Sequence, residues 1–308
     1  MIPTLAAATV LVGLSRVGAH AVIRHGLKAS RERHAGTPLT LGLQAREVHI
    51  GTRNNKCLFG WFLAAAGVAP TPAVVVMHGW GANASLMLAV ARPLHEAGFA
   101  VLFLDARGHG RSDDDGFASL PRFAEDIEHG LDWLHRQPEV DASRCAVLGH
   151  SVGAAAALLA ASRRPDVAAV VSVSAFAHPE EVMRRMLAQR HVPYFMIGWY
   201  VLRYVQRVIG VRFNDIAPVN TIARVRCPVL LAHGTEDTTV PFADARRILA
   251  ARVHGKVRLI ALAGGHDTRA AMTQRAGVLI RFLHAALVSN HAAQTVPPAV
   301  PSSKVSTP

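Results

Sequence analysis

Short apolar runs recur along the chain, and stretches of mixed polar and apolar residues separate them. Two strand candidates, at 46–50 and 57–63, flank the turn-forming pair Asn54–Asn55 and predict a hairpin. Further candidates lie at 73–77, 99–104, 145–149, 167–174, 229–232 and 257–262. These runs are almost continuously apolar, which is typical of strands buried on both faces of a sheet.

Helical patterns alternate with these strands. They occupy about 84–97, 121–136, 152–163, 242–252 and 268–288. Alternation of strand and helix predicts an α/β fold, with a mostly parallel sheet and helices on both of its faces. Such sheets place their chemistry at the carboxyl ends of the strands. We therefore expect one α/β domain over about 45–288.

One segment interrupts the alternation. The stretch from about 176 to 217 holds all three tyrosines (Tyr194, Tyr200 and Tyr204) together with Phe195 and Trp199. Its length and aromatic content predict a helical cap insertion that lies over one end of the sheet. Its arginines could contact anionic lipid or simply face water.

The two ends of the chain differ from its middle. Residues 1–35 begin with fifteen uncharged residues, and basic residues follow from Arg16 onward, which is the reverse of a cleaved signal peptide. Three interpretations stay open for this segment: an N-terminal membrane anchor with the body on the cytoplasmic side, an interfacial amphipathic helix, or a surface helix packed on the domain. Residues 289–308 are rich in Pro, Ser, Thr and Ala and predict a disordered tail.

Composition narrows the function classes. The chain has 308 residues, 51% of them hydrophobic, and a formal net charge of +12. Despite this charge, no helix-turn-helix, zinc-finger or aromatic-interleaved basic pattern indicates a nucleic-acid partner. The three cysteines, at 57, 145 and 227, form neither a metal pattern nor an evident disulfide framework. This usage suits a reducing, cytosolic compartment of bacterial type.

The stretch CAVLGHSVGAAA at 145–156 carries the candidate chemistry. It places Ser151 between Gly149 and Gly153, where a strand gives way to a helix. A serine hydroxyl needs a neighbouring base and a stabiliser for the oxyanion that it creates. A tight turn exposes that hydroxyl but brings strand and helix very close, so its flanking residues must be tiny. The pattern G-H-S-V-G meets this requirement.

With these residues the chain resembles the α/β-hydrolase superfamily, within its serine esterase, lipase and serine aminopeptidase-like branch. Three more segments carry the resemblance: VVVMHGWGAN at 74–83, LDARGHGRS at 104–112 and LLAHGTEDTTVP at 230–241. A fourth, LAGGHDTR at 262–269, follows a late strand. The resemblance implies that the backbone amides of Trp80 and Val152 form an oxyanion hole, and that His78, Asp105 and His109 are structural.

The resemblance also implies a catalytic triad of Ser151, Asp237 and His266. Their order along the chain is the one expected of this fold. His266 would act as the general base, and Asp237 would hold its tautomer and stabilise the imidazolium. Glu236 is the competitor for the acidic role. Neither a metal nor a cofactor is implied.

These observations predict a serine hydrolase that cleaves a carboxylic ester or thioester through an acyl-enzyme. The apolar insertion favours an apolar, lipid-like acyl substrate, and the N-terminal segment suggests a membrane surface as partner. Two alternatives stay open: an aminopeptidase or amidase of the same fold, and a catalytically silent, membrane-tethered binding protein. We expect the protein in the cytoplasm or on the cytoplasmic side of a membrane.

Overall fold

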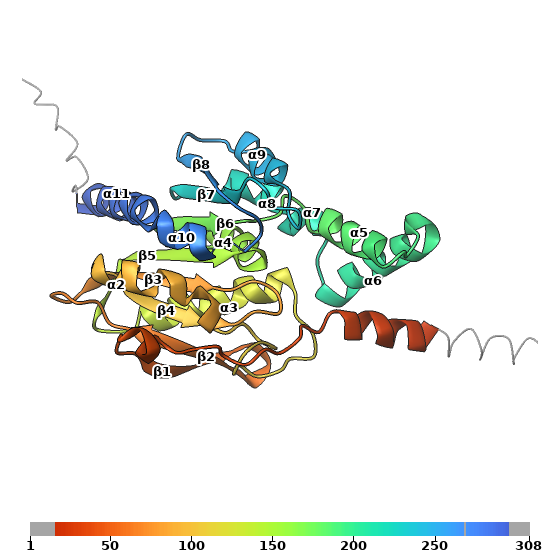
Figure 1. Ribbon diagram of the computed structural model, residues 1–308, viewed down its shortest axis with the longest axis horizontal. Helices are drawn as coiled ribbons and strands as arrows, with labels where there is room; N and C mark the ends of the chain where they lie inside the picture. The colour runs from red at the N-terminus through yellow and green to blue at the C-terminus, as the bar shows by residue number, and fades with distance from the viewer. Residues whose placement is uncertain (1–15, 268, 296–308) are drawn as a thin grey trace, which may run out of the picture.

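A single mixed sheet organises the chain, as the computed structural model shows over residues 16–267 and 269–295 (Figure 1). Eight strands lie in the order β1-β2-β4-β3-β5-β6-β7-β8. The β1–β2 and β2–β4 pairs are antiparallel, and the other neighbouring pairs are parallel. The strands are β1 Arg46–Thr52, β2 Lys56–Leu63, β3 Thr71–Met77, β4 Ala100–Leu104, β5 Val140–His150, β6 Ala169–Val173, β7 Val229–Gly234 and β8 Val257–Leu262.

Each predicted strand is present, and the continuous apolar runs are explained by burial on both faces. Along β3, Val75 and Met77 contact one buried cluster, whereas Val74 and Val76 contact another. Successive side chains of a strand point to opposite faces, so both clusters need apolar residues at adjacent positions. The predicted parallel sheet is therefore confirmed.

Helices cover both faces of this sheet (Figure 1). Residues of α3 and α4 belong to one cluster, and residues of α2, α10 and α11 belong to the other. In α3, Phe123, Ile127 and Leu131 are buried at intervals of four residues, as an amphipathic helix requires. The helices are 16–26, α2 Ala91–Glu96, α3 Leu120–Leu134, α4 Val152–Arg163, α5 Pro179–Gln189, α6 Trp199–Ile209, α7 Phe213–Ile216, α8 Pro218–Thr221, α9 Phe242–Ala250, α10 Arg269–Gln274 and α11 Ala276–Thr295.

Three predicted helix boundaries need correction. The first half of the stretch at 84–97 is a 3₁₀ helix, Ala84–Val90. The stretch at 268–288 is divided into α10 and α11. The predicted tail at 289–308 begins too early, because α11 continues to Thr295. Good helix formers such as Ala292 and Ala293 continue until the proline pair at 297–298. Residues 296–308 lie outside the described residues.

The segment between β6 and β7 holds α5 to α8 and a π-helical turn at Tyr194–Gly198. We call residues 176–217 the cap. The helix at 16–26 lies beside α6 (Figure 1), where His20 contacts Tyr200 at 2.7 Å and Arg24 donates to the Tyr204 hydroxyl at 3.0 Å. Residues 16–26 thus follow the interpretation of a packed surface helix, whereas residues 1–15 lie outside the described part of the chain. In residues 16–267 and 269–295, no helix combines the length and apolar character that crossing a membrane requires.

Candidate active site

Ser151 stands at a sharp turn between β5 and α4. Its backbone angles are φ 55° and ψ −116°, a combination that is strained for a residue with a side chain. Its amide donates to the carbonyl of Val173 at 2.8 Å, which ties the turn to the neighbouring strand β6. The turn thus fixes the serine at the carboxyl edge of the parallel sheet and at the amino end of α4.

Two glycines make this turn sterically feasible. A β-carbon at Gly149 would lie 2.2 Å from the carbonyl oxygen of Gly153, and one at Gly153 would lie 2.3 Å from the carbonyl oxygen of His78. No side chain fits at either distance. The fully buried Ala154–Ala157 then let α4 lie close to the sheet. The glycine requirement inferred from the sequence is confirmed.

Ser151, His266 and Asp237 form a continuous hydrogen-bonded series. The imidazole Nε2 of His266 lies 3.0 Å from the Ser151 hydroxyl oxygen, and its Nδ1 lies 2.8 Å from Oδ2 of Asp237. The three residues come from the loops after β5, β8 and β7, which are brought together because parallel strands end at one edge. Glu236 is exposed, whereas Asp237 is buried, so the geometry places Asp237 in contact with the histidine.

The surroundings of Asp237 keep its carboxylate ionised. Burial alone raises the pKa of this group, but hydrogen bonds from His233, His266 and the backbone of Val240 outweigh it and hold the pKa well below its usual range. Oδ1 accepts the amides of Thr239 and Val240 at 2.9 and 2.7 Å. Oδ2 is thereby left directed at the imidazole of His266, where it can stabilise a positive charge.

A cavity of about 700 Å³ opens onto the Ser151 hydroxyl. The cap supplies one wall, with Met183 and Met186 from α5 and Val205 from α6. The other wall comes from loops of the sheet edge. The apolar lining around a small number of polar groups is typical of sites for small organic ligands.

The residues of both candidate oxyanion-hole amides lie beside the serine. Trp80 and Val152 both line the cavity beside Ser151. Among the described residues, neither amide donates a hydrogen bond to a protein acceptor. Val152 is the first residue of α4, where amides lack intrahelical partners and the helix dipole favours negative charge. Gly79 precedes Trp80 because a β-carbon there would already lie 3.2 Å from that of Ser151.

Comparison with known proteins identifies the family and the fold. Residues 68–209 match a family model described as serine aminopeptidase, S33. An esterase of Pyrococcus furiosus, Pf2001, superposes with a TM-score of 0.68 at 21% sequence identity, over 84% of this chain and 96% of that one. An uncharacterized protein of Mycobacterium tuberculosis H37Rv is 32% identical over 222 residues, which are 72% of each chain. The chain belongs to the α/β-hydrolase superfamily. Another relative, the sn-1-specific diacylglycerol lipase ABHD11 of Xenopus tropicalis, is 30% identical over 139 residues, 41% of the hydrolase and 42% of the relative.

The loop after β4 supports the hydrolase site without facing it. Asp105 is fully buried and accepts the amides of Ala84 and Arg111 at 2.7 and 2.8 Å, and it contacts Nε2 of His34 at 2.9 Å. It therefore joins the N-terminal segment, the 3₁₀ helix after β3 and its own loop. The structural role expected for Asp105 is confirmed.

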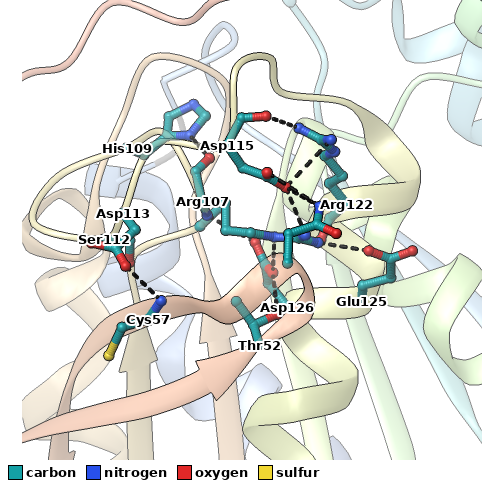
Figure 2. A network of polar contacts seen from close by, with 12 residues as sticks. Thr52, Cys57, Arg107, His109, Ser112, Asp113, Asp115, Arg122, Glu125 and Asp126 are labelled. Carbon is teal, nitrogen blue, oxygen red and sulfur yellow. Dashed lines mark hydrogen bonds and ion pairs between the residues drawn. The ribbon is translucent and has the colours of Figure 1, made fainter. Parts of the chain in front are cut away.

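Figure 2 shows how Arg107 anchors the same loop. Its guanidinium is almost fully buried and donates to Asp126 at 2.7 Å, Glu125 at 2.7 Å and Asp115 at 3.1 Å. Thr52 on β1 donates to Asp126 at 3.3 Å. A buried guanidinium is costly unless it is paired, so this network fixes the loop relative to α3 and β1.

Two buried histidines beside the serine are uncharged and hydrogen-bond to the backbone of neighbouring loops. Burial lowers the pKa of both His78 and His150 to about 4. His78 donates from Nδ1 to the carbonyl of Gly79, and its Nε2 accepts the amide of Ala106. His150 Nε2 lies 2.9 Å from the carbonyl of His266 and holds the histidine loop. These contacts agree with the structural role implied for His78.

The contacts made by His150 and His233 were not foreseen from the sequence. Both residues lie inside motifs that were singled out, GHSVG and LLAHGTED. Their nearness in the sequence to Ser151 and Asp237 could have indicated a role in the site. The sequence does not show, however, in which direction their side chains point. In residues 16–267 and 269–295, no cluster of three or more His, Cys, Asp or Glu is arranged to hold a metal ion.

Proposed function

We propose that this hydrolase cleaves carboxylic esters or thioesters with an apolar acyl group, through an acyl-enzyme on Ser151. The observation that carries the proposal is the hydrogen-bonded series from Ser151 through His266 to Asp237, which opens onto an apolar cavity of about 700 Å³. A nucleophile, a base and an orienting acid are thereby within reach of one bound substrate.

The first half of the reaction forms the acyl-enzyme. As the Ser151 oxygen attacks the carbonyl carbon, its proton passes to Nε2 of His266. The amides of Trp80 and Val152 donate to the oxygen that becomes negative, and the Asp237 carboxylate stabilises the imidazolium. The carbon–oxygen or carbon–sulfur bond then breaks, and the leaving group takes the proton from His266.

The second half releases the acid. Water enters the vacated leaving-group space and gives a proton to His266 as its oxygen attacks the acyl carbon. The tetrahedral species collapses, the bond to Ser151 breaks, and the serine oxygen regains its proton from His266. The net reaction adds one water to the ester and restores the enzyme.

The cap should select the acyl group. Each buried methylene contributes about 0.8 kcal/mol, which corresponds to roughly a fourfold rise in kcat/KM until the cavity is full. The lipase named among the relatives supports a lipid-like acyl group.

Hydrolysis of p-nitrophenyl esters from acetate to palmitate, with wild type and Ser151→Ala side by side, tests the proposal. Wild type should turn over the series with a distinct chain-length optimum, and Ser151→Ala should lose nearly all turnover. Ser162→Ala is the matched control because Ser162 lies on the same helix and donates to the carbonyl of Leu159. Equal turnover by wild type and Ser151→Ala would contradict the mechanism.

Amide hydrolysis is the second candidate, since the matched family model is described as serine aminopeptidase. Such an enzyme would need a carboxylate for the free amino group of its substrate, and Asp267 lines the cavity beside His266. Amino-acid p-nitroanilides assayed in parallel with the esters distinguish the two activities. Faster turnover of the anilides would favour the peptidase.

A further inference from the structure

Exposed apolar side chains gather at the tip of the cap. Phe195, Met196, Ile197 and Trp199 are 83, 69, 54 and 55% exposed. Single exposed apolar residues are common on soluble proteins, but a continuous group of large ones marks a site of interaction. These four residues belong to the π-helical turn and to the first turn of α6.

A basic cavity adjoins this apolar tip. It encloses about 380 Å³ between the helix at 16–26 and α6, and no carboxylate lines it. Four arginines line it: Arg16, Arg203, Arg207 and Arg212. Within the described part of the chain, none of the four forms an ion pair, whereas Arg107, Arg164 and Arg247 are all paired elsewhere. The unpaired guanidinium groups predict an anionic partner.

The spacing along α6 places both kinds of residue on one side. Trp199, Arg203 and Arg207 follow one another at intervals of four residues, so they share a face of the helix. Val205 and Ile209 point the other way and line the catalytic cavity. One helix thus separates the catalytic cavity from the apolar and basic surface.

The helix at 16–26 begins at the same end of the molecule as the apolar tip of the cap (Figure 1). His20 stacks on Tyr204 with ring centroids 3.7 Å apart, and its Nε2 contacts the Tyr200 hydroxyl at 2.7 Å. Arg16, where the described chain begins, therefore lies in the basic cavity beside Trp199. The fifteen residues before it contain no charged side chain. Figure 1 shows this end of the helix and the cap on the same side.

We propose that the docking face, formed by Phe195, Met196, Ile197, Trp199 and the four arginines, binds a bilayer that contains anionic phospholipid. The apolar side chains enter the interface, as they do in interfacial helices, and the guanidinium groups bind lipid phosphates. Docking brings the cap to the membrane surface. The inference goes beyond the proposed ester hydrolysis and does not depend on it.

Charge complementarity favours a bilayer over the other occupants of such a face. A second copy of the chain would bring eight unpaired arginines together, and like charges across an interface are strongly unfavourable. Single-stranded nucleic acid could stack its bases on Phe195 and Trp199, but it would leave the exposed aliphatic side chains of Met196 and Ile197 in water. A bilayer accommodates both the aliphatic side chains and the arginines.

Co-sedimentation of the full chain with vesicles tests the proposal. Vesicles of phosphatidylcholine alone are compared with vesicles that also contain phosphatidylglycerol. We expect preferential binding to the second, weakened by salt because exposed charges are screened. Arg203→Gln/Arg207→Gln should reduce the partition coefficient roughly 25-fold, since each arginine near an anionic surface contributes about a factor of five.

Matched variants separate the contributions. Arg246→Gln/Arg258→Gln removes the same charge from α9 and β8, which lie apart from α6 and the helix at 16–26 in Figure 1, and should bind as wild type does. Phe195→Ser/Ile197→Ser should weaken binding to both kinds of vesicle. Deletion of residues 1–15 should leave the dependence on Arg203 and Arg207 intact.

Four results would overturn the proposal. The first is equal binding of vesicles by wild type and Arg203→Gln/Arg207→Gln, and the second is loss of vesicle binding only when residues 1–15 are deleted. The third is a stable dimer that Phe195→Ser/Ile197→Ser dissociates. The fourth is binding of a single-stranded oligonucleotide without binding of vesicles. Vesicle binding is measured by sedimentation for both wild type and Ser151→Ala. Hydrolysis of the soluble acetate ester is measured in a separate assay without vesicles. Failure of the docking inference is therefore distinguishable from failure of the proposed hydrolysis.

Discussion

Gly234 ends β7 directly beneath the loop that carries His266, and its replacement by alanine tests how tightly that loop is positioned. A β-carbon at Gly234 would lie 2.4 Å from the carbonyl oxygen of Gly265 and 2.6 Å from that of Gly264. Both contacts are to backbone, so no side chain can move aside to relieve them. The loop must shift, and His266 is its next residue.

The size of that shift follows from the contact distance. An ordinary contact of a β-carbon begins near 3.4 Å, so the loop must retreat by about 1 Å. The hydrogen bond from His266 to Ser151, now 3.0 Å, would then be lost or badly aligned. A misplacement of about 1 Å in a catalytic group costs roughly 100-fold in rate, or about 2.7 kcal/mol.

Steady-state kinetics with a p-nitrophenyl ester measure the effect. We expect kcat of Gly234→Ala to fall roughly 100-fold while KM changes little, because Gly234 itself does not line the cavity that holds the acyl group. Gly255→Ala is the matched control, since a β-carbon at Gly255 meets nothing within 4 Å. Circular dichroism and urea unfolding establish that both variants are folded. A folded Gly234→Ala with wild-type kcat would refute the reasoning.

Three other variants, one of them with a matched control, test separate parts of the account. Asp237→Asn should lower kcat about 10⁴-fold, because the amide no longer fixes the tautomer of His266. Its control, Glu236→Gln at the exposed neighbouring position, should keep a kcat close to that of wild type in the same ester assay. Met183→Trp, in the cap wall of the cavity, should lower the ratio of octanoate to acetate turnover and so shift the chain-length optimum to shorter esters. His78→Gln should flatten the fall in unfolding free energy between pH 7 and pH 5, measured by urea denaturation.

The sign of the last effect follows from the buried, neutral state of His78. Its folded-state pKa, about 4, lies below the ordinary value of 6.5. Between these values the unfolded chain binds a proton that the folded chain does not, so stability is full above 6.5 and falls as the pH drops toward 4. The loss amounts to about 2 kcal/mol at pH 5. Equal pH dependence of wild type and His78→Gln would contradict it.

Local features of the chain predicted most of the fold. The runs that became β3 to β7 are apolar at adjacent positions, which burial on both faces explains. The turn at Ser151 was equally evident, because its flanking glycines are visible in the sequence. Gly149 is required by contact with the backbone of Gly153, and Gly153 by contact with the backbone of Met77 and His78. Asp237 and His266 were found through the resemblance to the α/β-hydrolase superfamily, each in a segment that follows a strand, and their contact joins residues 29 positions apart.

Long-range contacts could not be read from the sequence. The docking of His20 and Arg24 on α6 joins residues 180 positions apart, and no periodicity in either segment indicates its partner. His34 contacts Asp105 for similar reasons, across 71 positions. Side-chain direction was also hidden, since His150 turns to the carbonyl of His266 although it lies next to the serine. Local pattern thus predicts elements, whereas tertiary packing decides these pairs.

Covalent labelling tests the central claim most directly. The full chain is incubated with a fluorophosphonate, digested, and analysed by mass spectrometry to locate the adduct. The account predicts a single adduct on Ser151, absent in Ser151→Ala and formed much more slowly in His266→Gln, because the base then no longer activates the hydroxyl. Labelling of another residue, or no labelling of folded wild type, would contradict the claim that Ser151 is the nucleophile.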